Sequence, residues 1–110
     1  MTPQTVDPEI FKQLQEAAGA DFVRDLIGTF LEEAPRMMND LRAALEARDA
    51  DKFRRAAHSL KSNSLAFGAS ALAAIAREHE LAGVERSQPL AALEAEYGRV
   101  ARRLGDLRNA

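Results

Sequence analysis

The chain of 110 residues contains no cysteine. This absence excludes a disulfide scaffold, a cysteine nucleophile, a thiol redox centre and any zinc site built on sulfur ligands. Long apolar runs are missing too, because no segment approaches the roughly 18 residues that a membrane-spanning helix needs. The opening segment, MTPQTVDPEI, lacks the basic and apolar blocks of a signal peptide. We therefore expect a soluble, cytoplasmic protein without a membrane segment.

An excess of one charge sign is also absent. Lysine and arginine number 15 and aspartate and glutamate number 17, which gives a net charge of -2. This balance provides no overall attraction for the phosphates of DNA or RNA, so we expect no nucleic-acid partner. With 46% hydrophobic and 29% charged residues, the chain is too apolar to be disordered.

Residues that favour strands are scarce. Valine, isoleucine and threonine together number 10, whereas there are 22 alanines and 13 leucines. This composition favours helices over strands. A chain of this length forms one domain at most, so we expect a single helical bundle domain over residues 1–110.

Capping residues and apolar spacing predict five helices. Asp7 and Pro8 suit the start of the first, and Gly19 suits its end. Pro35 removes a hydrogen bond from the second, so we expect a kink there, with a complete break as the alternative. The first helix is expected at Pro8–Ala18, and the second from Asp21 to the region of Arg48 and Asp49. The third should begin after Asp49 or Asp51 and reach about Phe67. The fourth should run from about Ser70, as N-cap, to Ala82 before Gly83, and the fifth from about Pro89 to Leu107. Short connections make neighbouring helices antiparallel, which predicts an all-α, up-down four-helix bundle with a short extra N-terminal helix.

Helical spacing assigns one apolar face to each of these helices. The expected core faces are Ile10, Leu14 and Ala17 in the first helix, positions from Phe22 to Leu45 in the second, Phe53, Ala57, Leu60, Ser64 and Phe67 in the third, Leu72, Ile75, Ala76 and His79 in the fourth, and Leu90 to Leu107 in the fifth. On the third helix His58 falls about 140° from the centre of the core face. We therefore expect His58 to point to solvent.

The neighbours of His58 suit a nucleophile that docks against a partner. Lys61 lies one turn further on, where its ammonium group disfavours a protonated imidazole and can pair with an anion attached to the ring. Ser62 is small and leaves the ring accessible, and Leu65 provides an exposed apolar contact. A solvated histidine without chemistry remains the alternative from these residues alone.

The segment AAHSLKSNSLAFGA, from Ala56 to Ala69, resembles the signature of histidine phosphotransfer (HPt) domains. That signature has a histidine, any residue, an apolar residue, a lysine and a glycine, and a second glycine ten positions after the histidine. The matching residues are His58, Leu60, Lys61 and Gly68. Ser62 departs from the pattern, since the family most often has glycine there. The resemblance continues upstream and downstream over much of the chain.

The resemblance implies roles for individual residues. His58 would be phosphorylated on Nε2, Lys61 would stabilise the phosphoryl group, and Gly68 would form the sharp turn between two core helices. Glu80 occupies a position where the family often has a glutamine or glutamate that reaches the imidazole. Its carboxylate could accept a hydrogen bond from Nδ1 of His58 and leave Nε2 free, although a solvated surface glutamate is the alternative. His79 is expected to be a semi-buried residue of the helix seam.

The resemblance also implies a function. The chain would carry a phosphoryl group between aspartates of receiver domains, with a hybrid sensor histidine kinase upstream. We expect no kinase activity and no cofactor of its own, because the sequence has no glycine-rich phosphate loop and no metal-ligand spacing. The Mg²⁺ would belong to the receiver domain. The family implies a monomer, and the Met1 start favours a free-standing protein.

Receiver docking is expected on the exposed flank around His58. The candidate docking residues are Arg54, Ser62, Leu65 and Gly68, with Ile10, Phe11 and Leu14 from the first helix. Two other functions remain open. One is an HPt-like adaptor that binds a signalling partner without phosphoryl transfer. The other is a bundle metalloprotein that uses His58 and His79 with nearby glutamates.

Overall fold

The structure is a computed structural model that describes residues 5–86 and 89–109. Within these ranges the regular secondary structure is entirely helical, which confirms the predicted all-α class. The helices are α1 (Pro8–Ala18), α2 (Ala20–Ala47), α3 (Ala50–Ala66), α4 (Ser70–Arg86) and α5 (Ala91–Arg108). Across the described part of the chain, no helix combines the length and apolar character that crossing a membrane requires.

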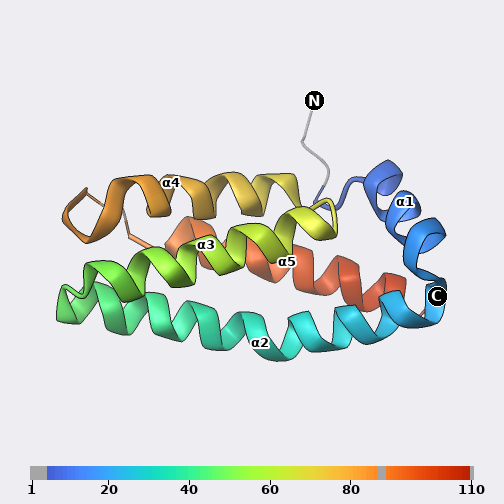
Figure 1. The fold of residues 1–110 in the computed structure, drawn as a ribbon, viewed down its shortest axis with the longest axis horizontal. Coiled ribbons are helices and arrows are strands. Elements are labelled where there is room, and N and C mark those ends of the chain that lie inside the picture. The colour runs from blue at the N-terminus through green and yellow to red at the C-terminus, as the bar shows by residue number, and fades with distance from the viewer. Residues whose placement is uncertain (1–4, 87–88, 110) are drawn as a thin grey trace.

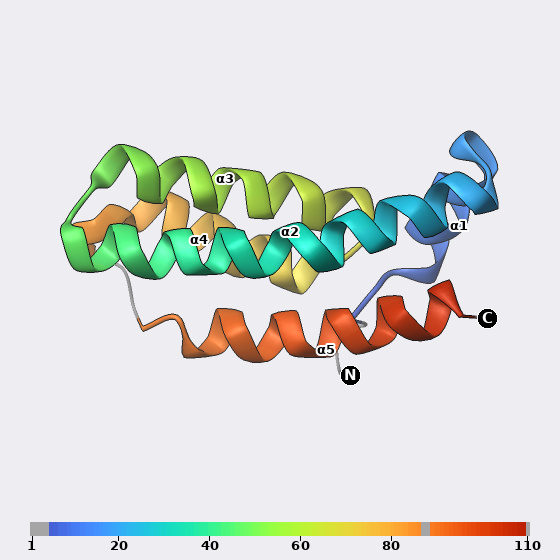
Figure 2. The ribbon, with the colours of Figure 1, turned by 90° about the horizontal axis from the view of Figure 1, so that it is seen from below.

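The four longer helices lie side by side, and successive ones run in opposite directions (Figure 1). α3 packs against both α2 and α4, and α5 packs against the same two helices from the other side, as the view in Figure 2 shows. The short α1 lies at one end of this assembly, where it contacts α2 and α3. The end of the molecule that carries α1 therefore also contains the turn between α3 and α4.

Side-chain caps explain where the first and third helices begin. The Asp7 carboxylate accepts hydrogen bonds from the backbone N–H groups of Glu9 (2.9 Å) and Ile10 (3.4 Å). Asp49 does the same for Lys52 at 3.1 Å. Each cap satisfies N–H groups that have no partner inside the helix. Both starting points agree with the predictions from the sequence.

Other helix ends differ in detail from the predictions. α2 runs through Pro35 as one element, so the alternative of a complete break is wrong. Ser70 is the first residue of α4 and not its N-cap. The buried Ala69 precedes it, and the Ala69 carbonyl accepts a hydrogen bond from the Ala73 N–H. α4 has a non-helical residue at Gly83, which agrees with the predicted end of the regular helix.

The core follows the predicted faces, with corrections in α1 and α2. All five core residues predicted for the third helix are buried, and so are most of those predicted for the fourth and fifth helices. In α1, however, Phe11 is the buried residue, Ile10 and Leu14 are half-buried, and Ala17 is exposed. Phe22 was expected in the core, but it is 55% exposed. It lies in the first turn of α2, where helical spacing continues but the neighbouring helices leave the side chain uncovered.

His79 is buried in the core and packs edge-on against Phe53, with 6.2 Å between the ring centroids. Burial lowers the pKa of His79 below its usual value, and the neighbouring carboxylate of Glu78 opposes this effect only in part. The predicted semi-buried seam residue is therefore more enclosed than expected. The folded state therefore favours the neutral form of His79.

This burial makes the stability of the protein depend on pH. Because the pKa of His79 is lower in the folded state, the unfolded state takes up the proton first as the pH falls below about 6.5. The stabilisation is complete above that pH and is lost on acidification. We expect the wild type to lose stability relative to His79→Leu between pH 7.5 and pH 5, as measured by urea unfolding. His58 is present in both proteins, so its contribution cancels. An equal pH dependence for the two proteins would contradict this prediction.

Gly68 forms the turn between α3 and α4 with a positive φ of 77°. Its carbonyl accepts a hydrogen bond of 2.9 Å from the Asp7 N–H, which attaches the start of α1 to the turn. A Cβ atom at this position would lie 3.0 Å from Cβ of Ile10 and 3.1 Å from the Asp7 carbonyl oxygen. Glycine is thus required here both for the backbone conformation and for the close approach of α1.

Replacing Gly68 with alanine should therefore cost about 2–4 kcal/mol of unfolding free energy, from left-handed strain and from overpacking against α1. Gly105→Ala is the matched control, because Gly105 lies inside α5 with open space around it and alanine favours helices. Urea unfolding should show the loss only for Gly68→Ala. Equal stability of the two variants would contradict the argument.

Candidate functional site

His58 lies on the exposed face of α3, as predicted, with 59% of its side chain accessible. Its Nδ1 lies 2.8 Å from Oε2 of Glu80 on α4. Among the described residues, none forms a hydrogen bond with Nε2. The imidazole is therefore held at one nitrogen and open at the other.

Glu80 connects two side chains of α3. While Oε2 contacts His58, Oε1 accepts a hydrogen bond of 2.8 Å from Nζ of Lys61. The Glu80 and Lys61 side chains are only 16% and 22% exposed, so this ion pair is better shielded than the imidazole. The structure thus brings Glu80 and His58 into the contact that the resemblance implies, and it places the Glu80 side chain between α3 and α4 instead of leaving it fully solvated. The ion pair between Lys61 and Glu80 was not predicted from the sequence.

The charge state of Glu80 follows from these contacts. The hydrogen bond from Lys61 is the main reason that the pKa of Glu80 lies below its usual value, and the contact with His58 acts in the same direction, whereas burial opposes both. Glu80 is therefore ionised at neutral pH and can only accept hydrogen bonds. A neutral His58 in this contact must carry its proton on Nδ1, which leaves the lone pair on Nε2.

The other candidate residues lie around this centre. Arg54 and Ser62 are exposed on α3, and Leu65, about two turns beyond His58, is 52% exposed. Gly68 is buried beneath α1, so it contributes a turn and no accessible surface. The half-buried Ile10 and Leu14 belong to α1, at the end of α3 that contains Leu65.

The two histidines occupy different environments, since His58 is exposed and His79 is buried against Phe53. In residues 5–86 and 89–109, no three or more His, Cys, Asp or Glu side chains gather as ligands for a metal ion.

The chain is similar to known proteins in sequence and in fold. The family model described as "Hpt domain" matches residues 25–110. Among solved structures, the crystal structure of histidine-containing phosphotransfer protein B (HptB) from Pseudomonas aeruginosa PAO1 is similar, with a TM-score of 0.70 and 29% sequence identity. The match covers 97% of this chain and 90% of that chain. No curated protein matches the sequence.

Proposed function

This chain belongs to the HPt domain family and has a phosphotransfer role in a phosphorelay, and we propose that it carries the phosphoryl group on Nε2 of His58. The observation that supports this most strongly is the contact between Glu80 and Nδ1, at 2.8 Å, on a ring that is otherwise exposed. That contact favours the one tautomer whose outward-facing nitrogen is a nucleophile.

The proposed transfer begins with the neutral imidazole. The Nε2 lone pair attacks the phosphorus of an aspartyl phosphate on a receiver domain, the bond between phosphorus and the aspartate oxygen breaks, and the aspartate leaves as a carboxylate. No proton moves, because Nδ1 keeps its hydrogen. The ring becomes positively charged as the new bond forms, and the ionised Glu80 stabilises that charge. Transfer to the next receiver reverses these steps, and we propose that the Mg²⁺ of each receiver stabilises the moving phosphoryl group.

Lys61 has a second proposed role besides phosphate stabilisation. In this structure its ammonium group is paired with Oε1 of Glu80. That bond restrains the carboxylate so that its other oxygen faces Nδ1 of His58. We therefore assign to Lys61 the positioning of Glu80 in the unphosphorylated protein. To contact a phosphoryl group on His58, the Lys61 ammonium would have to break its hydrogen bond with Glu80 or bind both groups at once.

This role can be separated from phosphate binding by NMR of unphosphorylated protein. At about pH 8, where an ordinary histidine is neutral, we expect the ¹⁵N shifts of His58 to report mainly the Nδ1–H tautomer. Lys61→Met should reduce that population, because Glu80 loses its restraint, and Lys61→Arg should restore it. A role confined to binding phosphate would leave the tautomer unchanged in Lys61→Met.

Transfer rates complete the comparison. Lys61→Met should slow phosphoryl transfer from a receiver about tenfold, but it should have little further effect once Glu80 has been replaced by alanine, because the two residues act as one unit. Equal effects in both backgrounds would show that Lys61 acts without Glu80. Circular dichroism controls for the helical content of each variant.

The proposed docking surface is the exposed side of α3 around His58, with Arg54, Ser62 and Leu65, continued by Ile10 and Leu14 of α1. Leu65 offers an apolar contact, and Arg54 a positive charge for an acidic receiver. Ser62 stands one turn after His58, where its small side chain leaves room for a phosphoryl group and its hydroxyl can donate to it.

The function is tested by incubation with a labelled, phosphorylated receiver domain. We expect label on the wild type that is labile in acid and stable in base, and no label on His58→Gln. His79→Leu is the matched control, because it removes the other histidine and should still become labelled. Label on His58→Gln would contradict the assignment.

The alternative function is an adaptor that binds a partner without transfer, which the serine at position 62 favours. In that case His58→Ala and the wild type would bind the receiver equally well and neither would become labelled.

We further propose, in keeping with the family, a cytoplasmic monomer without kinase activity and with a hybrid kinase upstream. The alternating helix directions in Figure 1 support an up-down four-helix bundle with α1 as the extra helix, within one domain.

A further inference from the structure

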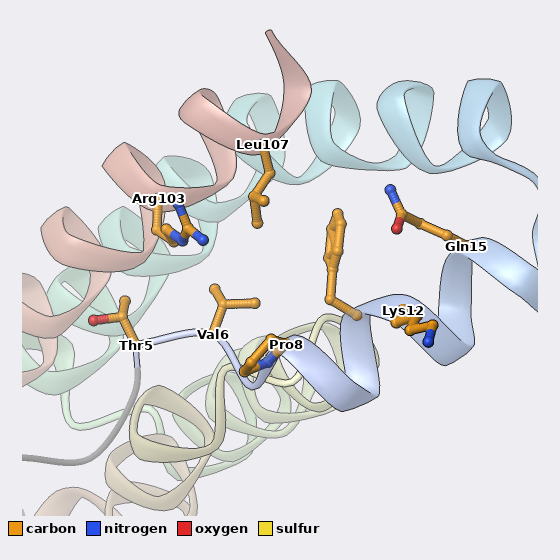
Figure 3. A pocket seen from close by; sticks show the side chains of 8 residues that line it. Thr5, Val6, Pro8, Lys12, Gln15, Arg103 and Leu107 are labelled. Atoms are coloured by element: carbon orange, nitrogen blue, oxygen red, sulfur yellow. The ribbon is translucent and has the colours of Figure 1, made fainter. Parts of the chain in front are cut away.

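A pocket of about 340 Å³ lies between α1 and the C-terminal half of α5 (Figure 3). His58, Lys61 and Glu80 do not line it. Val6, Phe11 and Leu107 give it an apolar interior, and Val6 and Leu107 face one another across the gap. Its volume is at the lower end of the roughly 300–1,000 Å³ that is usual for small-molecule sites.

The polar side chains around this pocket are positively charged or neutral. Arg103 of α5 lies on one side of Leu107 in Figure 3, and Lys12 and Gln15 of α1 lie on the other. No carboxylate is found among the described lining residues. Neither Lys12 nor Arg103 forms an ion pair with another described residue. Two cations without an ion pair to a described residue therefore stand beside one apolar hollow, in a protein with a net charge of -2.

From this combination we propose that the pocket binds a small amphipathic organic anion, with an apolar body of one or two rings or a short alkyl chain and one acidic group. The body would occupy the space between Phe11 and Leu107, and the acidic group would contact Arg103 or Lys12 at the rim. This site does not depend on phosphoryl transfer.

A ligand at this place would link α1 to α5. α1 is held on its other side, where the Asp7 N–H donates to Gly68 and Ile10 lies against the same glycine. Phe11 and Lys12 are turned toward the pocket. Binding to the folded state alone raises the melting temperature, and the stabilisation grows with the logarithm of one plus the ratio of ligand concentration to dissociation constant.

The test uses 8-anilinonaphthalene-1-sulfonate, a fluorescent anion with an apolar body, and the full chain without any receiver or kinase. We expect saturable binding of one molecule with a dissociation constant of about 10–100 µM. Octanoate should displace the probe, and inorganic phosphate at the same concentration should not. The uncharged analogue N-phenyl-1-naphthylamine should bind at least about threefold more weakly, because it lacks the acidic group.

Variants locate the site. Arg103→Gln or Lys12→Gln, or both, should weaken binding of the sulfonate about three- to tenfold. Arg102→Gln is the matched control, since Arg102 is the next residue of α5 and does not line the pocket. NMR shifts on binding should concentrate at Val6, Phe11 and Leu107. The proposal is overturned by the absence of saturable binding, by affinities of the Arg103 and Lys12 variants equal to those of Arg102→Gln and the wild type, or by shifts centred elsewhere.

Discussion

The position of Glu80 beside His58 depends on how α4 returns along α3, and the turn at Gly68 sets that return. Gly68, with its positive φ, lies in the three residues that reverse the chain between α3 and α4, and its carbonyl accepts a hydrogen bond from the Asp7 N–H just before α1. Leu60 of α3 and Leu72 of α4 are both fully buried in the same hydrophobic core, and the two helices are in contact. A different turn would change the register of α4, and Glu80 would no longer lie within hydrogen-bonding distance of Nδ1.

The two faces of α3 differ in role, since the buried face packs in the core and the exposed face presents the candidate site residues. The buried face contains Ser64, whose hydroxyl donates to the Leu60 carbonyl at 2.6 Å and so needs no partner from another helix. The exposed face presents His58, Ser62 and Leu65. Substitutions on the exposed face can therefore change partner recognition while the core stays intact, which suits a domain that meets more than one receiver.

In the proposed function the site needs few residues, because it would supply only part of the reaction. An exposed imidazole is a usable nucleophile when its tautomer is determined and its ring is kept in one orientation. We propose that the half-buried Glu80 provides both, while its hydrogen bond with Lys61 holds the carboxylate in place. In the proposed transfer, the charge on Glu80 would also favour the cationic ring of phosphorylated His58, so one carboxylate would serve the acceptor before and after transfer.

Much of this could be predicted from the sequence, because helix caps, apolar periodicity and the exposure of His58 depend on local spacing along the chain. Asp7, Asp49 and Gly68 mark the boundaries correctly for that reason. The resemblance to HPt domains added the partner of Nδ1. Only the tertiary structure decided that Lys61 pairs with Glu80, that Phe11 and not Ile10 is the buried residue of α1, and that Phe22 stays exposed. These features depend on the relative rotation and register of separate helices, and periodicity within one helix contains no information about either.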